Sequence, residues 1–462
     1  MHKDLGEDRM AKLLIIADDF TGALDTGVQF AASGAVTQVV TNYEYDIDQL
    51  EPNVQVLVMD AETRHLSGVE AGQIVYSIVS RACKAGIPYI YKKTDSALRG
   101  NIGSELTAAL EASGKDMLHF LPAYPSMKRT TVGGKHYIDG VPVQESVFGQ
   151  DPFEPVTCSS LVDMIHEQSQ VNVRLKSTEH TAKIMEALKA EHEKLSHTEE
   201  TEAQRWEHWL EDENQKRKPH IVVYDAETNE DMQDWAKLLG ETNNLHLLAG
   251  CAGFASFLPK LLELEGEGQP MPEFGDKFLV ACGSVNPITK KQLDYAENHG
   301  FTRIRVTPEQ KLEENFFDTE KGQACLAEWI QICKTTERCI IDTNDLPGTN
   351  DTLDYAGAHG LTIEDVRYRI STTLGCVVKK LVKAGVQSTM LLTGGDTLLG
   401  FMNQMKVYEI QPVCEMAPGT VLSVFKIGDK NYSVISKSGG FGEEDLMVTL
   451  ANEILKGRDK SC

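Results

Sequence analysis

The stretch that decides the fold is KLLIIADDFTG, residues 12–22, close to the start of the chain. Its first part, Lys12–Ala17, is a short apolar run, which is typical of a strand buried on both faces of a parallel sheet. Asp18 and Asp19 follow directly, and a helical pattern covers Ala23–Ser33. A strand, a polar turn and a helix in this order predict the first half of a βαβ unit.

The same alternation continues along the chain at βαβ spacing. The other strands expected in the first half are Val36–Thr41, Val54–Asp60, Tyr89–Lys92, His220–Tyr224 and Leu245–Ala249, with a helix over Gly68–Ala85. Those expected in the second half are Phe278–Cys282, Thr302–Val306, Arg338–Asp342, Ser388–Thr393 and Val421–Ile427, with a long helix over Thr362–Ala384. The pattern predicts an α/β protein whose mostly parallel sheets are flanked by helices.

A chain of 462 residues exceeds one ordinary domain, so two or three are expected. Residues 266–277 read GEGQPMPEFGDK, without periodicity, and predict a linker. The expected domains are therefore 10–265 and 278–457, with a ligand cleft between them. Residues 177–218 are rich in Glu and Lys and predict polar, solvent-facing helices.

The net charge of −24, from 45 basic and 69 acidic residues, excludes some partners. A surface this negative repels nucleic acid and anionic lipid, so neither nucleic acid nor membrane is expected as a partner. The ten scattered cysteines, the polar opening of the chain and the lack of a long apolar run indicate a cytoplasmic protein. An anionic substrate would require locally clustered Lys and Arg.

Asp18 and Asp19 form the first candidate site, since two adjacent carboxylates at a strand end repel one another and need a cation, a donor or a substrate hydroxyl. The helix that opens at Gly22 offers amide groups to an anion. A purely structural alternative is that one Asp caps this helix. A cap does not account for both carboxylates, so a functional role is favoured.

The positive charge that an anionic substrate requires is concentrated in YKKTDSALRGN, residues 91–101. Arg99 can grip a carboxylate with two hydrogen bonds, and a Lys can act as a point charge. A second basic segment with glycines, residues 122–134, follows another apolar run. The candidate substrate contacts are Thr21, Lys92, Lys93, Ser96, Arg99, Gly100, Asn101, Tyr124 and Arg129.

The second half carries three Gly-containing turns that follow strands or lie near the end of the chain. They contain Gly283-Ser284, Thr393-Gly394-Gly395-Asp396-Thr397 and Lys437-Ser438-Gly439-Gly440. Such turns let backbone N–H groups surround phosphate, so three of them favour a nucleotide site. A P-loop, a dinucleotide fingerprint after a strand, a zinc spacing and a Gly-x-Ser-x-Gly elbow are all absent from the sequence.

At these residues the chain resembles the four-carbon acid sugar kinase family over nearly its whole length. The resemblance rests on six blocks in the family's order: IADDFTGALD, KKTDSALRGNIGSE, PAYPSMKRTTVGGKHYIDGVPVQES, GSVNPITKKQ, TGGDT and KSGGFG. It implies an N-terminal domain that holds the sugar acid and a C-terminal domain that holds ATP. The ATP contacts that it implies are Ser284, Gly394, Gly395, Asp396, Thr397, Lys437, Gly439 and Gly440.

The hypothesis is transfer of a phosphoryl group from ATP to the terminal hydroxyl of D-threonate, D-erythronate or 3-oxo-tetronate. Arg99 and Lys93 would hold the acid's carboxylate, and Asp18, Asp19 or Asp95 would accept the hydroxyl proton. Mg²⁺ is expected at the ATP phosphates, near Asp396. The sequence leaves three matters open: a non-catalytic sensor, a metal-dependent sugar-acid lyase, and assembly as a homodimer.

Overall fold

A computed structural model describes residues 11–151, 154–177, 218–428 and 430–456. The chain divides into two compact units, residues 1–268 and 269–462, and the predicted linker spans that division. Most of the polar segment 177–218 and both outer ends of the predicted domains lie outside the described residues.

The first unit is built on a sheet whose neighbouring strands all run parallel. In spatial order its strands are β2 (Thr37–Val40), β3 (Val56–Asp60), β1 (Leu13–Ala17), β4 (Tyr89–Lys93), β11 (Leu247–Gly250), β5 (Met117–Leu121), β10 (His220–Tyr224) and β9 (Asn172–Lys176). Its helices are α1 (Phe20–Ala32), α2 (Gly68–Ala85), α3 (Ile102–Ser113), α4 (Leu161–Gln168), α7 (Asn229–Glu241), α8 (Ala252–Ala255) and α9 (Leu258–Leu261). The α/β class and the parallel sheet predicted from KLLIIA are confirmed.

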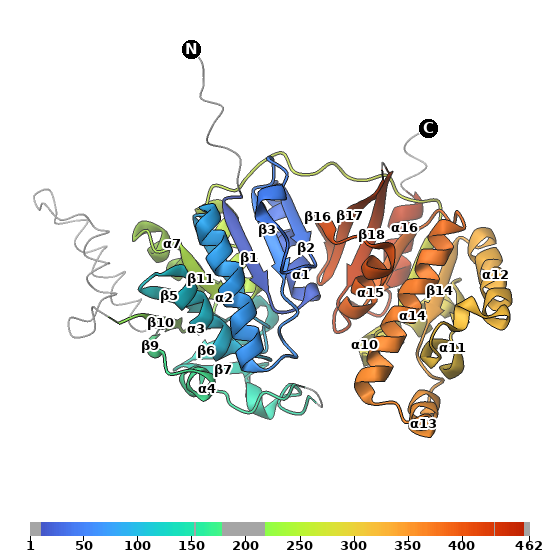
Figure 1. Cartoon of the computed structure of the whole chain (residues 1–462), viewed down its shortest axis with the longest axis horizontal. Helices are drawn as coiled ribbons and strands as arrows, with labels where there is room; N and C mark the ends of the chain where they lie inside the picture. Colours follow the sequence, from blue (N-terminus) through green and yellow to red (C-terminus); the bar gives the residue numbers. More distant parts are fainter. Residues whose placement is uncertain (1–10, 152–153, 178–217, 429, 457–462) are drawn as a thin grey trace, which may run out of the picture. The chain divides into compact units, whose positions relative to one another are not determined.

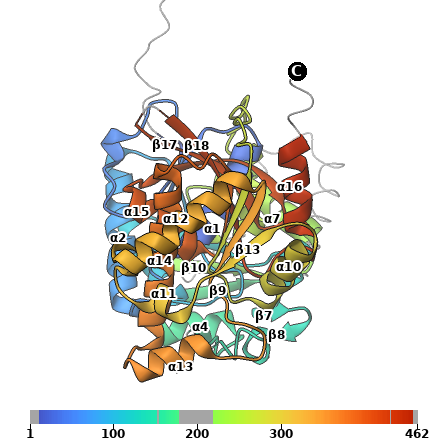
Figure 2. The same ribbon diagram turned by 90° about the vertical axis from the view of Figure 1, so that its right-hand side faces the viewer.

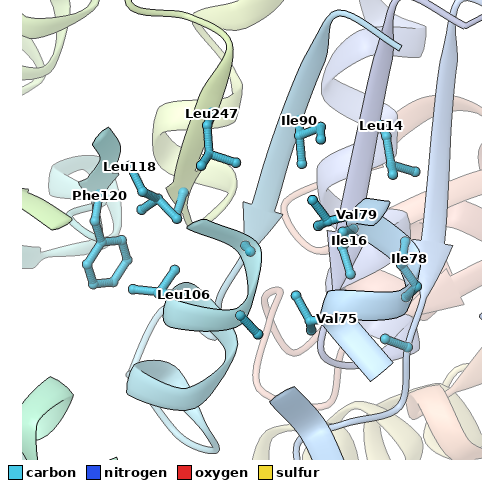
Figure 3. Packing of buried hydrophobic residues seen from close by; sticks show 14 of the residues in the cluster. Leu14, Ile16, Val75, Ile78, Val79, Ile90, Leu106, Leu118, Phe120 and Leu247 are labelled. Atoms are coloured by element: carbon cyan, nitrogen blue, oxygen red, sulfur yellow. The ribbon is translucent and has the colours of Figure 1, made fainter. Parts of the chain in front are cut away.

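Burial on both faces explains why these strands read as unbroken apolar runs. Helices α2, α3 and α4 supply one core with alternate residues of β1, including Leu14 and Ile16. Figure 3 shows these two side chains directed toward Val75 and Val79 of α2. Since strand residues alternate between faces, the other residues of β1 are directed toward the side of α1.

The order of the strands fixes where a ligand can reach this sheet. The connection from β1 through α1 leads one way along the sheet, to β2, while those from β4 through α3 lead the other way, to β5. The loops that follow β1 and β4 therefore separate at the carboxyl ends of neighbouring strands. Open α/β sheets bind ligands at such a topological switch point.

A small antiparallel sheet, β6 (Arg129–Val132), β7 (Lys135–Ile138) and β8 (Val141–Pro142), follows β5. Asp225, just after β10, anchors its first hairpin by accepting hydrogen bonds from the amides of Gly133 and Gly134, at 2.8 and 2.9 Å. This sheet places the basic segment 122–134 beside the loop that follows β4.

The second unit has a mixed sheet in the order β13 (Thr302–Arg305), β14 (Arg338–Asp342), β12 (Phe278–Cys282), β15 (Thr389–Thr393), β18 (Lys430–Lys437), β17 (Thr420–Ile427) and β16 (Glu409–Ala417). Strands β13 to β18 in this order pair in parallel, and β17 pairs antiparallel with both its neighbours. The helices are α10 (Pro287–Asn298), α11 (Pro308–Leu312), α12 (Glu320–Thr335), α13 (Asp351–Ala358), α14 (Ile363–Lys383), α15 (Gly395–Met405) and α16 (Leu446–Lys456).

Helices α10 and α16 pack on one face of this sheet, in a core that includes Phe278, Val280, Leu293 and Leu450. Helices α12, α14 and α15 contact β14, β12 and β15 in turn (Figures 1 and 2). The connections from β12 and from β15 lead in opposite directions along the sheet, to β13 and β16. The second unit therefore has its own switch point, between the loops that follow β12 and β15.

Candidate active site

Arg64 organises the switch point of the first unit. It follows β3, and its guanidinium pairs with Asp18 at 2.8 Å and with Asp19 at 2.7 Å. Its Nη2 also lies 3.8 Å from Asp95, in the loop after β4. One buried arginine thus draws together all three carboxylates predicted as catalytic candidates. Sequence reasoning missed Arg64, although a basic residue shortly after the strand ending at Asp60 is the kind of signal that identified the other loops.

The two adjacent aspartates play different structural parts. Asp18 is almost fully buried, and its Oδ1 has no hydrogen-bond partner within the described chain. Burial favours a raised pKa for Asp18, but Arg64, Lys93 and Lys92 outweigh it and hold that pKa below the usual range. Asp19 is the N-cap of α1 and accepts a hydrogen bond from the amide of Gly22 at 2.9 Å. Its side chain is the most exposed of the three, at 27%.

Asp95 is clamped by Arg99 within its own loop. Nε and Nη2 of Arg99 donate to the two carboxylate oxygens at 2.9 and 3.0 Å. Burial alone favours a raised pKa for Asp95, but Arg99 and Arg64 hold it well below the usual range. Arg99 also lies 3.5 Å from Asp151, so its charge is already balanced by acids.

The turn 98–101 is shaped to bring Arg99 and Arg64 together. Leu98 and Gly100 have positive φ angles, of 65° and 89°, and a Cβ added at Gly100 would lie only 3.1 Å from Cγ of Arg64. Asn101 then donates to the carbonyls of Thr63 and Leu66, both at 2.9 Å. Gly100 and Asn101, both predicted as substrate contacts, therefore join the loops after β3 and β4, and their contact with a ligand stays a prediction.

Lys92 and Lys93 point to opposite faces of the sheet, as neighbours on a strand must. Lys92 is fully buried and pairs with Glu105 of α3 at 2.9 Å. Lys93 lies on the α1 side, where a Cβ added at Gly22 would lie 2.7 Å from its amine and 2.6 Å from Oδ1 of Asp19. Within the described residues no carboxylate lies within 4.0 Å of the Lys93 amine. Of the two lysines, only Lys93 offers an uncompensated charge at the switch point.

The segment after β5 completes this site. Arg129, at the start of β6, donates to the hydroxyl of Ser96, and His136 of β7 hydrogen-bonds the carbonyl of Ser96 at 3.1 Å. Because that carbonyl can only accept, Nε2 of His136 carries the proton, and burial lowers the pKa of His136 to about 4. Tyr124 pairs through its backbone with Arg129. Thr21 lies in the first turn of α1, next to Asp19.

Two further acids near Asp19 were not predicted. Glu62, with a φ of 46°, accepts a hydrogen bond from the amide of Phe20 at 3.2 Å. Burial and the charges of Glu62 and Asp19 raise the pKa of Asp60 well above its usual range. In the sequence, Asp60 is simply the last residue of an apolar strand. Nothing in the local pattern indicates that Glu62 and Asp19 lie beside it.

The switch point of the second unit brings hydroxyls and glycines together. A Cβ added at Gly439 would lie 2.6 Å from Oγ of Ser284, and one added at Gly394 would lie 3.6 Å from Oγ1 of Thr397 and 3.8 Å from the amide of Ser284. Gly394 has a φ of 91°, and Gly395 opens α15. The turns after β12, β15 and β18 therefore meet, as the predicted nucleotide contacts require. Gly440 lies beside Asn286.

Lys437 holds the last of these turns from beneath. Its amine donates to the carbonyls of Ser438 and Gly439, at 3.0 and 3.4 Å, and to Thr289 of α10, at 3.3 Å. Thr289 in turn donates to the carbonyl of Gly439 at 2.8 Å. Lys437 is 1% exposed, and burial lowers its pKa to about 8.

Asp396 differs from the other predicted nucleotide contacts because its side chain forms an ion pair. Its half-exposed carboxylate takes two hydrogen bonds from Arg367 of α14, at 2.6 and 3.2 Å. Asn344, which follows β14, was missed by sequence reasoning and donates to the carbonyl of Ser284 at 3.1 Å. Four strand ends of the sheet, those of β12, β14, β15 and β18, therefore contribute to this site.

Comparison with known proteins finds a family model for each part of the chain. Residues 13–258 match the family model of a sugar-binding N-terminal domain, and residues 279–447 match that of a nucleotide-binding C-terminal domain. A D-threonate kinase of Salmonella typhimurium is 28% identical over 449 residues, covering 94% of this chain and 96% of its own length. The chain belongs to the four-carbon acid sugar kinase family.

Other members of this kinase family are similarly distant. A D-erythronate kinase of Heliobacterium modesticaldum is 25% identical, over 96% of this chain and 98% of its own. A 3-oxo-tetronate kinase of Cupriavidus necator is 24% identical, over 93% of this chain and 94% of its own. The family and the kinase class are therefore established, while relatives with three different substrates are about equally similar.

Solved structures support the fold of this kinase. Crystal structures of a Salmonella typhimurium protein and of a Haemophilus influenzae protein each cover 96% of this chain, and 99% and 100% of their own. Their TM-scores are 0.76 and 0.71 at 20% identity. In the described parts of this kinase no helix combines the length and apolar character needed to cross a membrane.

Proposed function

We propose that this kinase transfers the γ-phosphoryl group of ATP to the terminal, 4-hydroxyl of a four-carbon sugar acid such as D-threonate, D-erythronate or 3-oxo-tetronate. The observation that carries the proposal is the switch point of the first unit, where ionised aspartates lie beside cations without a carboxylate partner. A hydroxy acid needs both: a cation for its carboxylate and an acceptor for its hydroxyl proton.

Among the basic residues of this site, we assign the substrate carboxylate to Lys93 and Arg129. Arg64 and Arg99 already bind Asp18, Asp19 and Asp95. No carboxylate of the described residues lies within 4.0 Å of Lys93 or Arg129. The assignment keeps Lys93 from the sequence hypothesis and replaces Arg99, because a guanidinium with two acid partners would have to break buried ion pairs before it could bind a ligand.

Asp19 is the best-placed base of the three candidates. Asp95 gives both oxygens to Arg99, and Asp18 is almost fully buried. Asp19 uses Oδ1 for Arg64 and Gly22, which leaves Oδ2 of its part-exposed side chain for a substrate hydroxyl. A proton acceptor of this kind typically contributes about 10²–10⁴-fold to the rate.

The second unit would bind ATP through the amides and hydroxyls around Ser284, Gly394, Thr397 and Gly439. In the described residues no group of three or more potential protein ligands forms a metal cage. That fits Mg²⁺, which usually keeps its waters and takes one or two carboxylates together with substrate phosphates. Asp396 would lie near its water shell, because both of its carboxylate oxygens accept hydrogen bonds from Arg367, and bound Mg²⁺ would neutralise charge on the transferring phosphoryl group.

The test is an ATP-dependent screen of the purified protein against four-carbon sugar acids, with ADP release as the readout and NMR of the product to locate the phosphate. We expect turnover with one of the three named acids and phosphate on the oxygen of the fourth carbon. Nucleotide and acid binding without ADP release would indicate a sensor. Conversion of the acid without ATP would indicate a lyase.

A further inference from the structure

The segment 143–151 brings an aromatic ring against the basic loop. Phe148 lies beneath two guanidinium groups: the central carbon of Arg99 is 5.3 Å from the ring centroid, and that of Arg129 is 5.4 Å from it. Both distances are within the range of an attractive cation–π contact. Among the described side chains, Phe148 is thus the one that makes a cation–π contact with both arginines.

The two arginines on this ring differ in their other partners. Arg99 has Asp95 and Asp151 beside it. Arg129 donates to the hydroxyl of Ser96, and within the described chain no carboxylate reaches it. A carboxylate partner fixes a guanidinium but cancels its charge, whereas an aromatic ring fixes it through the ring quadrupole and leaves the charge in place.

We propose that Phe148 is a positioning residue for recognition of the substrate's carboxylate: it holds Arg129 in place while keeping that charge available to the acid. The inference rests on the proposed function and adds a determinant of preference for an acid over a neutral analogue. Phe148 would not contact the reacting atoms, so its effect should appear in binding of the acid rather than in the chemical step.

The position of the ring is fixed by its own segment. Gln144 and Ser159 exchange two hydrogen bonds, at 3.1 and 2.9 Å, and the amide of Val156 donates to the carbonyl of Phe148 at 3.0 Å. A Cβ added at Gly149 would lie 1.9 Å from the carbonyl oxygen of Gln144, so the turn after Phe148 is closely packed. The backbone that carries the ring is therefore fixed independently of the arginines, and the ring itself packs against the hydrophobic core.

The first experiment compares Phe148→Leu, Phe148→Tyr and the control Val147→Ala, an exposed neighbour, with the unaltered kinase. The substrates are the best acid from the screen and its amide. We expect Phe148→Leu to raise KM for the acid by about 10-fold, with Phe148→Tyr and Val147→Ala within about twofold. KM for ATP and kcat should hold steady. Equal losses toward acid and amide, or an unchanged KM for the acid, would overturn the proposal.

A second experiment separates the loss of the cation–π contact from the change in side-chain shape that Phe148→Leu also causes. Pentafluorophenylalanine at position 148 keeps the ring but inverts its quadrupole, so it should behave like Phe148→Leu. In an Arg129→Met background, Phe148→Leu should add less than about twofold, because the residue it positions is gone. Wild-type behaviour of the fluorinated protein, or full additivity with Arg129→Met, refutes the role of Phe148. Failure of the unaltered protein to phosphorylate any acid refutes instead the proposed function on which this role depends.

Discussion

The two switch points of this kinase solve the same topological problem with different chemistry. At the carboxyl ends of β1, β3 and β4 the first unit gathers Asp18, Arg64 and Asp95 into buried ion pairs. At the ends of β12, β15 and β18 the second unit places Ser284, Gly394 and Thr397, whose contacts are made by backbone and hydroxyl groups. A small acid offers one charge and several hydroxyls, so discrete charged side chains suit it. A triphosphate spreads its charge over many oxygens, so amide-rich turns suit it.

Asp19→Asn should have the largest effect on the rate, and it should change only the step that depends on the first unit's site. Removing the proton acceptor should lower kcat by about 10²–10⁴-fold, while KM for ATP stays near the wild-type value. The measurement is ADP release under saturating acid, and Asp18→Asn and Asp95→Asn serve as matched variants. If all three retain near-normal turnover, no aspartate at this switch point is the base.

The next prediction asks which charges of the first unit are structural. Glu105→Gln removes the only carboxylate that pairs with buried Lys92 within the described residues, although the amine still donates to the carbonyl of Lys93, and should lower the free energy of unfolding by about 3–5 kcal/mol. The double variant Lys92→Met, Glu105→Leu should recover most of that loss, because two apolar groups replace the pair. Urea unfolding midpoints would measure both changes.

The same double variant decides the role of Lys92 as a substrate contact. If the buried pair is purely structural, KM for the acid stays near the wild-type value once stability is restored. A large rise in that KM would return Lys92 to the substrate site and make Lys93 the lesser of the two lysines.

In the second unit, a methyl group should be enough to disturb the nucleotide. Gly439→Ala would place a Cβ 2.6 Å from Oγ of Ser284, whereas in Gly440→Ala the nearest atom is 3.6 Å away, an ordinary contact. The Ser284 hydroxyl, a predicted ATP contact, would have to turn away from the added methyl group, so Gly439→Ala should raise KM for ATP by about 10-fold through loss of that contact. Gly440→Ala adds a methyl group to the same turn without a close contact, and an unchanged KM for ATP in Gly439→Ala would mean that Gly439 does not face the nucleotide.

Residues that the sequence singled out lie together at each switch point, and their contacts with ligands stay predictions. A glycine that follows a strand indicates a tight turn in the backbone. Gly394 and Gly439 could therefore be predicted as phosphate contacts from the sequence alone. Asp18 and Lys93 could be chosen in the same way, from their place at strand ends. The parallel sheets followed from the apolar runs, because strands buried on both faces leave no polar alternation.

What the sequence could not predict is which charges neutralise one another. Arg64 and Asp151 lie far along the chain from the residues that they bind, and Glu105 meets Lys92 only because α3 packs back against β4. Arg99 and Lys92 were read as ligand contacts for this reason, although each has a buried acid beside it. The local sequence pattern does not single out Phe148, because its proposed role depends on contacts with two arginines from other segments.

The smallest predicted effect separates the two sites by pH. Burial lowers the pKa of Lys437 to about 8, so this lysine is charged at neutral pH and loses its proton as the pH rises above 8. Because the folded-state pKa is below the ordinary lysine value, protonation opposes folding, and the contribution of Lys437 to stability rises from pH 8 to about 10.4.

Nucleotide binding should change in the opposite direction. A phosphate nearby favours the charged amine, so binding above pH 8 must take up a proton, and KM for ATP should rise by at most about 10-fold between pH 7 and 9. The acid site should follow less, because Arg129 stays charged over this range and the pKa values of Asp18 and Asp95 lie below their usual range. Lys437→Met should raise KM for ATP at pH 7 and remove its alkaline rise. A rise that persists in Lys437→Met, or an equal rise in KM for the acid, would assign the titration to another group and remove the distinction between the two switch points.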